Sequence, residues 1–250
     1  MSWNATPLSH GPVPLWFQIA ERLRAAIAAG TFSAGDVLPS EAELHAAFGV
    51  SRTTARASLE RLRQEGLISR HAGRGSILLK PKVEQPANQL ASFSEDMSRR
   101  GLRASYATAS AAPAPLTSEA AEALGLAQGA EAFCIHRLLQ ADGEPMGLSV
   151  SWLAPEVLAT SAPPTVADLD AGSLYAWLAR HCGARITGGH EYIEAAGADA
   201  ATARSLGVAR NAPILVARRR SWGPDGRPVE YAVMRYRADR YRFSVDLARA

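Results

Sequence analysis

Residues 39–56 read PSEAELHAAFGVSRTTAR, and this stretch decides the fold of the first part of the chain. Ser40 is a good helix N-cap, and Glu43 three positions later completes the pattern of a capping box. Gly49 is expected to end this helix, and Ser51 to cap the next one. The segment therefore predicts two short helices joined by a tight glycine turn, which is the arrangement of a helix-turn-helix.

The second of these helices is expected to run to about Glu65 and to have two distinct faces. Ala55, Leu59 and Leu62 follow one another at spacings of four and three, and they form the buried face. In a helix-turn-helix, the first turn of the second helix reaches base edges in the major groove. Arginine pairs with guanine through two hydrogen bonds, and threonine bonds a base or contacts the thymine methyl. The candidate base-reading residues are Arg52, Thr53, Thr54 and Arg56, and the hydroxyls of Ser40 and Ser51 are candidate phosphate contacts.

The flanking sequence extends this motif to a winged helix over residues 1–79. Residues 15–29 have the apolar periodicity of a helix, residues 31–39 read as a loop, and residues 67–70 and 76–79 predict a strand hairpin. The hairpin tip, residues 71–75, reads HAGRG and is basic and rich in glycine. Glycine allows close approach of the backbone, and arginine can enter a minor groove or pair with phosphate. The candidate DNA contacts in this wing are His71, Gly73 and Arg74.

The distribution of charge also indicates a DNA-binding first domain. Residues 1–80 carry nine basic and six acidic side chains, whereas residues 81–250 carry eighteen of each. The formal net charge of +3 therefore lies entirely in the first third of the chain. A local basic patch on a neutral body is typical of a DNA-binding head. The alternatives are an ordinary solvated surface and an architectural DNA protein, although the latter tends to be basic throughout.

Several motifs of the first domain together resemble the GntR family of bacterial regulators. They are PLWFQI at 14–19, GTF at 30–32, GDVLPSE at 35–41, GVSRTTAR at 49–56, EGLI at 65–68 and GRG at 73–75. The resemblance implies a homodimer that reads a short palindrome in double-stranded DNA, and it adds Glu41 to the DNA-binding positions. Many members of the family carry a DNA-contacting arginine where this chain has Ala42.

The second part of the chain predicts an α+β domain with an antiparallel sheet. Residues 80–91 read as a linker, because they contain prolines and few apolar side chains. The remaining domain is 92–250. Its expected strands are 103–110, 132–139, 146–153, 185–195, 213–222, 228–236 and 241–247, and its expected helices are 93–101, 118–125, 173–182 and 199–206.

This second domain resembles the UTRA ligand-sensing domain of the HutC-type branch, whose fold is similar to chorismate lyase. The resemblance rests on Arg137, on ADGEPM at 141–146, on SLY at 173–175, on GRPVEY at 226–231 and on YRADRYRF at 236–243. It implies a small-molecule effector, release from DNA by that effector, and a pocket. The pocket positions that match those of relatives which sense sugar phosphates are Ser94, Arg137, Ser173, Glu230 and Tyr236.

The chemistry of these pocket residues suits an anion, because arginine offers a forked set of donors to a carboxylate or phosphate. Two positions depart from the pattern, since Leu139 replaces a second arginine and Ser149 replaces an acid. We therefore expect a carboxylate or a phosphonate rather than an amino-sugar phosphate. A structural role remains an alternative for each position: an ion pair for Arg137, or an N-cap for Ser173.

An enzyme is the rival class, namely a chorismate-lyase-like enzyme with a DNA-binding head. The six histidines are scattered, and the sequence contains no HExxH, paired CxxC, P-loop or dinucleotide-binding glycine motif. We therefore expect no catalysis, metal site or cofactor. Residues 1–14 do not resemble a secretory signal, and no apolar run is long enough to span a bilayer. The prediction is a cytoplasmic protein with two reduced cysteines and no membrane contact.

Overall fold

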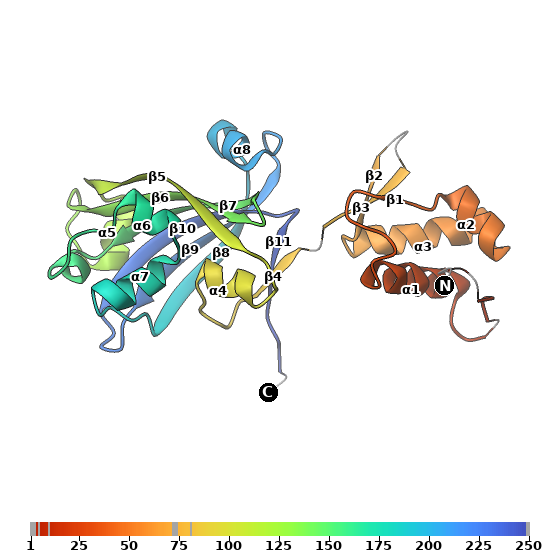
Figure 1. Cartoon of the computed structure of the whole chain (residues 1–250), viewed down its shortest axis with the longest axis horizontal. Coiled ribbons are helices and arrows are strands. Elements are labelled where there is room, and N and C mark those ends of the chain that lie inside the picture. The colour runs from red at the N-terminus through yellow and green to blue at the C-terminus, as the bar shows by residue number, and fades with distance from the viewer. Residues whose placement is uncertain (1–3, 5, 10, 72–74, 81, 249–250) are drawn as a thin grey trace. The chain divides into compact units, whose positions relative to one another are not determined.

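The chain folds into two compact units, residues 1–81 and residues 82–250 (Figure 1). The structure is a computed structural model that describes residues 4, 6–9, 11–71, 75–80 and 82–248. Each unit has a hydrophobic core of its own. Within the described residues, no helix has the length and apolar content needed to cross a membrane.

The first unit contains three helices and a three-stranded antiparallel sheet of order β1-β3-β2. Its elements are α1 (Leu15–Ala28), β1 (Val37–Leu38), α2 (Glu41–Phe48), α3 (Arg52–Gln64), β2 (Ile68–His71) and β3 (Gly75–Leu78). The predicted capping box joins Ser40 and Glu43 at the start of α2. Gly49 ends that helix in the left-handed region at φ 63°, where glycine is favoured. The helices and the hairpin predicted from sequence are confirmed.

The apolar faces of α1 and α3 form the core of this unit. Ile19 and Leu23 of α1 are fully buried in one cluster with Leu59 and Leu62 of α3. An ion pair closes one end of the helix pair, because Arg24 Nη2 lies 2.7 Å from Oε1 of Glu65.

Residues 31–39 were predicted as a loop, and this was wrong for residues 37 and 38. Val37 pairs with Ile77, and Leu38 pairs with Ser76, so that β1 becomes an edge of the small sheet. Leu38 is buried and Val37 is exposed. A strand of two residues is too short to show an alternating pattern, and its partner lies far along the chain.

The second unit is a six-stranded antiparallel sheet with helices on both faces (Figure 1). Its elements are β4 (Val83–Pro86), α4 (Phe93–Ser98), β5 (Ala104–Pro115), α5 (Ser118–Leu124), β6 (Glu131–Ala141), β7 (Glu144–Leu153), a 3-10 turn (Pro155–Leu158), α6 (Val166–Asp170), α7 (Leu174–His181), β8 (Gly188–Gly197), α8 (Ala200–Leu206), β9 (Pro213–Trp222), β10 (Pro228–Arg237) and β11 (Tyr241–Ser244). The strand order is β5-β6-β7-β10-β9-β8. The α+β prediction is confirmed, but the short helix α6 was not predicted.

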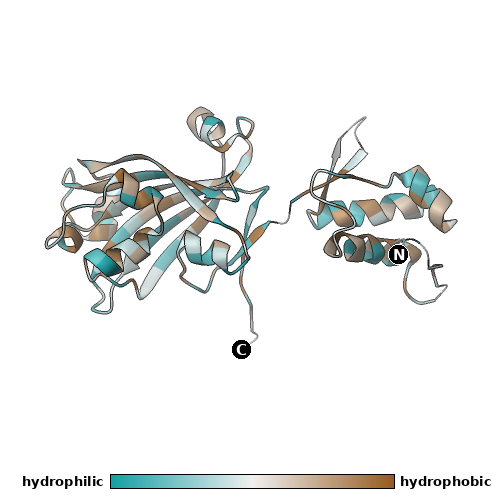
Figure 2. Cartoon of the chain, viewed as in Figure 1, coloured by the Kyte–Doolittle hydropathy of each residue, from teal (hydrophilic) through white to brown (hydrophobic). Residues whose placement is uncertain are grey.

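Alternation along the strands assigns the helices to the two faces of the sheet. Cys134 packs with α5 and α8, whereas its neighbour Ile135 packs with α6 and α7. Met97 of α4 lies in a third cluster with Leu139, on the same face as Ile135. Figure 2 shows the matching alternation of hydrophobic and hydrophilic residues along the strands. The two thiols, Cys134 and Cys182, are free, and burial raises the pKa of Cys134 to about 11.

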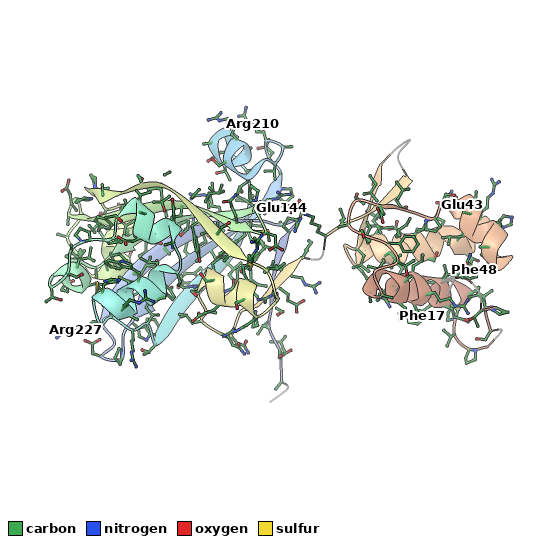
Figure 3. All side chains as sticks on the ribbon, viewed as in Figure 1. Phe17, Glu43, Phe48, Glu144, Arg210 and Arg227 are labelled. Atoms are coloured by element: carbon green, nitrogen blue, oxygen red, sulfur yellow. The ribbon has the colours of Figure 1, made fainter. Side chains whose placement is uncertain are left out.

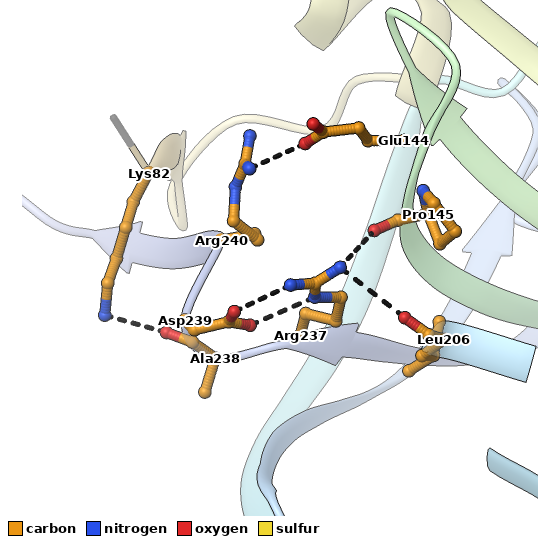
Figure 4. A network of polar contacts seen from close by, with 8 residues as sticks. All are labelled: Lys82, Glu144, Pro145, Leu206, Arg237, Ala238, Asp239 and Arg240. Carbon is orange, nitrogen blue, oxygen red and sulfur yellow. Dashed lines mark hydrogen bonds and ion pairs between the residues drawn. The ribbon is translucent and has the colours of Figure 1, made fainter. Parts of the chain in front are cut away.

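The linker predicted over residues 80–91 contains a strand, which corrects that prediction. β4 pairs in parallel with β11 and is held by a hydrogen bond of 2.7 Å from Val83 N to Arg240 O. The side chain of Lys82 donates to Ala238 O at 2.7 Å, as Figure 4 shows. In the same network, Arg240 Nη1 donates to Oε2 of Glu144 at 2.7 Å. β4 escaped prediction because one of its two buried side chains is the polar Gln85.

Candidate functional site

The first candidate surface is the exposed side of α3. Arg52, Thr53 and Arg56 are exposed, whereas Ala55 between them is fully buried. Ser51 caps the helix by accepting from Thr54 N at 3.1 Å. The Ser51 and Thr54 hydroxyls also lie 2.9 Å from each other. Arg52, Thr53 and Arg56 therefore project from the first turns of α3, while Ser51 and Thr54 contribute to its cap.

Glu41 at the start of α2 holds one of these arginines. Arg56 Nε donates to both carboxylate oxygens of Glu41 at 3.2 Å. This hydrogen bond and the negative charge of Glu41 raise the pKa of Arg56 above its ordinary value. Because a carboxylate repels phosphate, the contact makes Glu41 a positioning partner of Arg56 rather than a direct ligand of the DNA backbone.

Ser40 is occupied by its capping box. Its hydroxyl accepts from Glu43 N at 3.2 Å and donates to Oε2 of the same residue at 2.7 Å. Glu43, labelled in Figure 3, lies in the first turn of α2. Hydrogen bonds from the backbone and the hydroxyl of Ser40 lower the pKa of this carboxyl. Of the wing residues, Gly73, Arg74 and the side chain of His71 lie outside the part of the chain that is described.

The second candidate site is a buried pocket on the sheet of the second unit, between the strands and α4 and α7. Four of the five expected pocket residues line it, namely Arg137, Ser173, Glu230 and Tyr236. The two positions that depart from the family pattern, Leu139 and Ser149, line it as well. Its volume is about 40 Å³. Since that space holds only a few water-sized groups, a metabolite can bind only if lining side chains move.

Arg137 is the most unusual residue of the pocket. It is 8% exposed, and neither Nε nor Nη1 has a hydrogen-bond partner. Its guanidinium lies 4.8 Å from the centre of the Tyr106 ring. Burial lowers its pKa, and the neighbouring Tyr106 and Glu230 partly offset this effect. The cross-strand neighbour is Ser149, so no acid faces Arg137 across β7.

Ser94, the fifth expected pocket residue, is not among the lining residues. Its hydroxyl instead hydrogen-bonds the phenol of Tyr106, which supports the ring beneath Arg137. Its connection to the pocket is therefore indirect.

Glu230 carries the negative charge of the pocket. It is 3% exposed, and its Oε2 accepts from the Tyr175 hydroxyl at 2.9 Å. Burial and the charge of Glu230 raise the pKa of Tyr175, which keeps this phenol in its donating form. Ser173 caps α7 by accepting from Ala176 N at 3.4 Å, so its hydroxyl serves a structural role and also borders the pocket.

Tyr236 connects the pocket with β4. Its ring stacks on Tyr241 with centroids 4.1 Å apart, and the Tyr241 hydroxyl donates to Oε1 of Gln85 at 2.6 Å. Gln85 is 2% exposed and also lines the pocket. The strand that leads from the first unit is therefore part of the pocket wall.

Sequence reasoning missed a second buried arginine. Arg219 is 5% exposed and lines the pocket, but it is paired with Glu191 of β8, with its Nε and Nη2 each 2.9 Å from Oε1. Burial alone lowers its pKa, but Tyr175 and Glu191 raise it above the ordinary value. The signal in the sequence was a run of three arginines within an apolar strand, because alternation turns the middle one inward.

Family models match both units. Residues 17–78 match the model described as "Bacterial regulatory proteins, gntR family", and residues 99–242 match the UTRA domain. The chain is 34% identical to the HTH-type transcriptional regulator Rv0792c of Mycobacterium tuberculosis, over 97% of this chain and 89% of that protein. It is 33% identical to the HTH-type transcriptional repressor NagR of Bacillus subtilis, over 93% and 94%.

The structure is similar to the crystal structure of PhnF from Mycobacterium smegmatis. The TM-score is 0.65 at 27% identity, and the match covers 93% of this chain and 100% of that one. The likeness therefore includes both units.

Proposed function

The chain belongs to the gntR family of bacterial regulatory proteins and carries a UTRA domain, and we propose from this premise that it is a repressor released from its operator by a small anion. That it is a transcriptional regulator follows from the family. Relatives named as regulators favour this role over the lyase-like enzyme considered above. We expect it to act in the cytoplasm, on bacterial DNA.

The DNA-binding part of the proposal rests on the exposed side of α3. A homodimer would present two copies of α3 to successive major grooves about 34 Å apart, so its operator would be a palindrome. Arg52 and Arg56 are the proposed base readers, and Glu41 aims Arg56. Ser40, Ser51, Thr53 and Thr54, and the wing residues His71, Gly73 and Arg74, remain proposed contacts.

The effector part of the proposal rests on one observation, the buried guanidinium of Arg137 with two unpartnered nitrogens. A carboxylate or phosphonate would satisfy both through a forked pair of hydrogen bonds. Because the cavity is small, binding must displace lining side chains, and Gln85 on β4 is one of them. Binding would therefore favour one arrangement of the chain over another, and DNA affinity would change only as far as the two arrangements bind effector differently.

The proposal is tested by selecting bound fragments from a bacterial genome and measuring operator affinity by fluorescence anisotropy. Arg52→Ala or Arg56→Ala should cost roughly 1–3 kcal/mol of specific binding and relax the choice of sequence. Arg137→Ala should leave operator affinity intact and abolish release by carboxylates and phosphonates. Unchanged specificity in both α3 variants would refute the assigned reading helix, and normal release from the Arg137 variant would refute the assigned anion site.

A further inference from the structure

Two opposite charges line the buried pocket without neutralising each other. Arg137 is 8% exposed and Glu230 is 3% exposed. Within the described residues, no ion pair joins either of them to an oppositely charged side chain, and Arg137 has two nitrogens without any partner. Glu230 accepts a hydrogen bond from the neutral phenol of Tyr175. Each group is thus a buried charge that lacks a counter-charge in contact.

The sheet keeps these two groups apart. Arg137 on β6 faces Ser149 of β7, and Glu230 on β10 faces Leu153 of β7. The two facing positions are four residues apart, which corresponds to roughly 13 Å along the strand. The strand β7 also separates β6 from β10. The two charges therefore occupy opposite ends of one pocket.

The other charged side chains of the pocket already have partners. Arg219 is held by Glu191 at 2.9 Å, and Asp96 is contacted by Arg100 at 3.4 Å. Arg137 and Glu230 are the two that remain. A buried charge without a partner is costly, so a ligand gains most where it supplies the missing counter-charge.

We propose that the effector is a zwitterion whose anionic group binds Arg137 and whose ammonium or amidinium group, at the other end of a short body, binds Glu230. This proposal rests on the proposed function and names the class of its effector. The floor between the two ends carries the hydroxyls of Ser149 and Ser151 and the side chains of Ala232 and Met234. It therefore suits a short chain of mixed polarity.

Two other classes of ligand fit this arrangement less well. A sugar phosphate would satisfy Arg137, but it would leave the Glu230 carboxylate without a counter-charge and add a second negative charge to the pocket. A simple amine would satisfy Glu230 and leave Arg137 unpaired. Only a ligand with both charges removes both deficits.

The test uses calorimetric titration of the full-length protein with matched probes. They are 5-aminopentanoate, pentanoate and pentylamine, then 3-aminopropylphosphonate and propylphosphonate, with glucose 6-phosphate as the dianion. Each aminated acid should bind roughly 10- to 100-fold more tightly than its deaminated counterpart, which is the range expected for one hydrogen bond to a charged group.

Substitutions identify the two ends. Glu230→Gln should reduce the affinity for 5-aminopentanoate to that of pentanoate and leave pentanoate binding unchanged, whereas Arg137→Met should abolish both. Glu131→Gln is the matched control, because Glu131 is an exposed carboxylate on β6. Melting curves of each variant, and of the Arg137→Met and Glu230→Gln double variant, check the fold. The two effects on the melting free energy should add, since the groups are not in contact.

The proposal is overturned if pentanoate or glucose 6-phosphate binds as tightly as the zwitterions, if no probe binds at millimolar concentration, or if the double variant is strongly non-additive. Release of operator DNA by a simple carboxylate through Arg137 would sink the zwitterion and leave the proposed function standing. A protein that selects no DNA fragment would instead contradict the proposed function itself.

Discussion

Asp96 of α4 is a carboxylate that the fold buries almost completely, at 1% exposed. Burial raises its pKa above the ordinary value, and Arg100 one turn later offsets this only in part, with Nη1 3.4 Å from Oδ1. Because the folded pKa exceeds the unfolded one, the ionised form opposes folding. The penalty is present at neutral pH and disappears as the pH falls through the folded pKa.

Asp96→Asn should therefore stabilise the second unit at pH 7, since the amide keeps an acceptor for Arg100 and carries no buried charge. The gain in melting temperature over the unsubstituted chain should shrink as the pH is lowered below the usual range of aspartate. Thermal melts across this pH range measure it. A variant that melts lower at pH 7 would show that the pairing with Arg100 outweighs burial. Asp225→Asn, at an exposed turn, is the control.

At the same scale, the sequence predicted Arg137, Glu230 and Tyr236 because they lie in family motifs, but it did not predict their surroundings. The ring of Tyr106 beneath Arg137 and the ion pair of Arg219 with Glu191 depend on which strands become neighbours. Strand order β6-β7-β10-β9 is a property of the folded sheet. Single-residue chemistry identifies a candidate, and topology decides which counter-charge it meets.

Secondary-structure elements were predictable where their ends carry local signals. Ser40, Ser51 and Asp199 each cap a helix through a side-chain oxygen, as their positions before apolar stripes predicted. The strands β1 and β4 carry no such signal, because each is short and pairs with a segment far along the chain. Local rules therefore found the helices, and non-local pairing produced the misses.

A pair of substitutions at Ser40 separates its capping role from a role in DNA binding. Ser40→Ala should destabilise the first unit by about 1 kcal/mol, because Glu43 N loses its acceptor, whereas Ser40→Gly should cost only a few tenths. Denaturant unfolding measures stability, and anisotropy measures operator affinity. If Ser40 only caps α2, the glycine variant keeps its affinity for DNA. Equal losses of affinity in both variants would assign Ser40 to a phosphate.

The whole molecule has separate hydrophobic cores in its two units. Leu23 of α1 is fully buried in the core of the first unit alone. Stability of the DNA-binding unit and of the pocket unit should therefore respond to different substitutions.

Leu23→Ala should cost the first unit roughly 2–5 kcal/mol, through lost burial and the cavity that remains. Scanning calorimetry should show one transition moved to lower temperature and another unchanged. Operator affinity should fall, while the affinity of the second unit for the aminated probes stays the same. Leu178→Ala of α7, also fully buried, is the reciprocal control, because its cluster lies in the second unit. A single transition that shifts in both variants would contradict independent cores.

The pairing of β4 with β11 constrains how such regulators can exchange parts. Residues that arrive from the DNA-binding unit are tied to the end of the chain by Lys82, and they place Gln85 in the ligand pocket. A head swapped between relatives at residue 91, where the sequence suggests a free joint, would bring a foreign wall into the sensor. A junction at residue 81 would transplant the reader and leave the sensor whole, so recombination that preserves ligand choice is expected to cross over there.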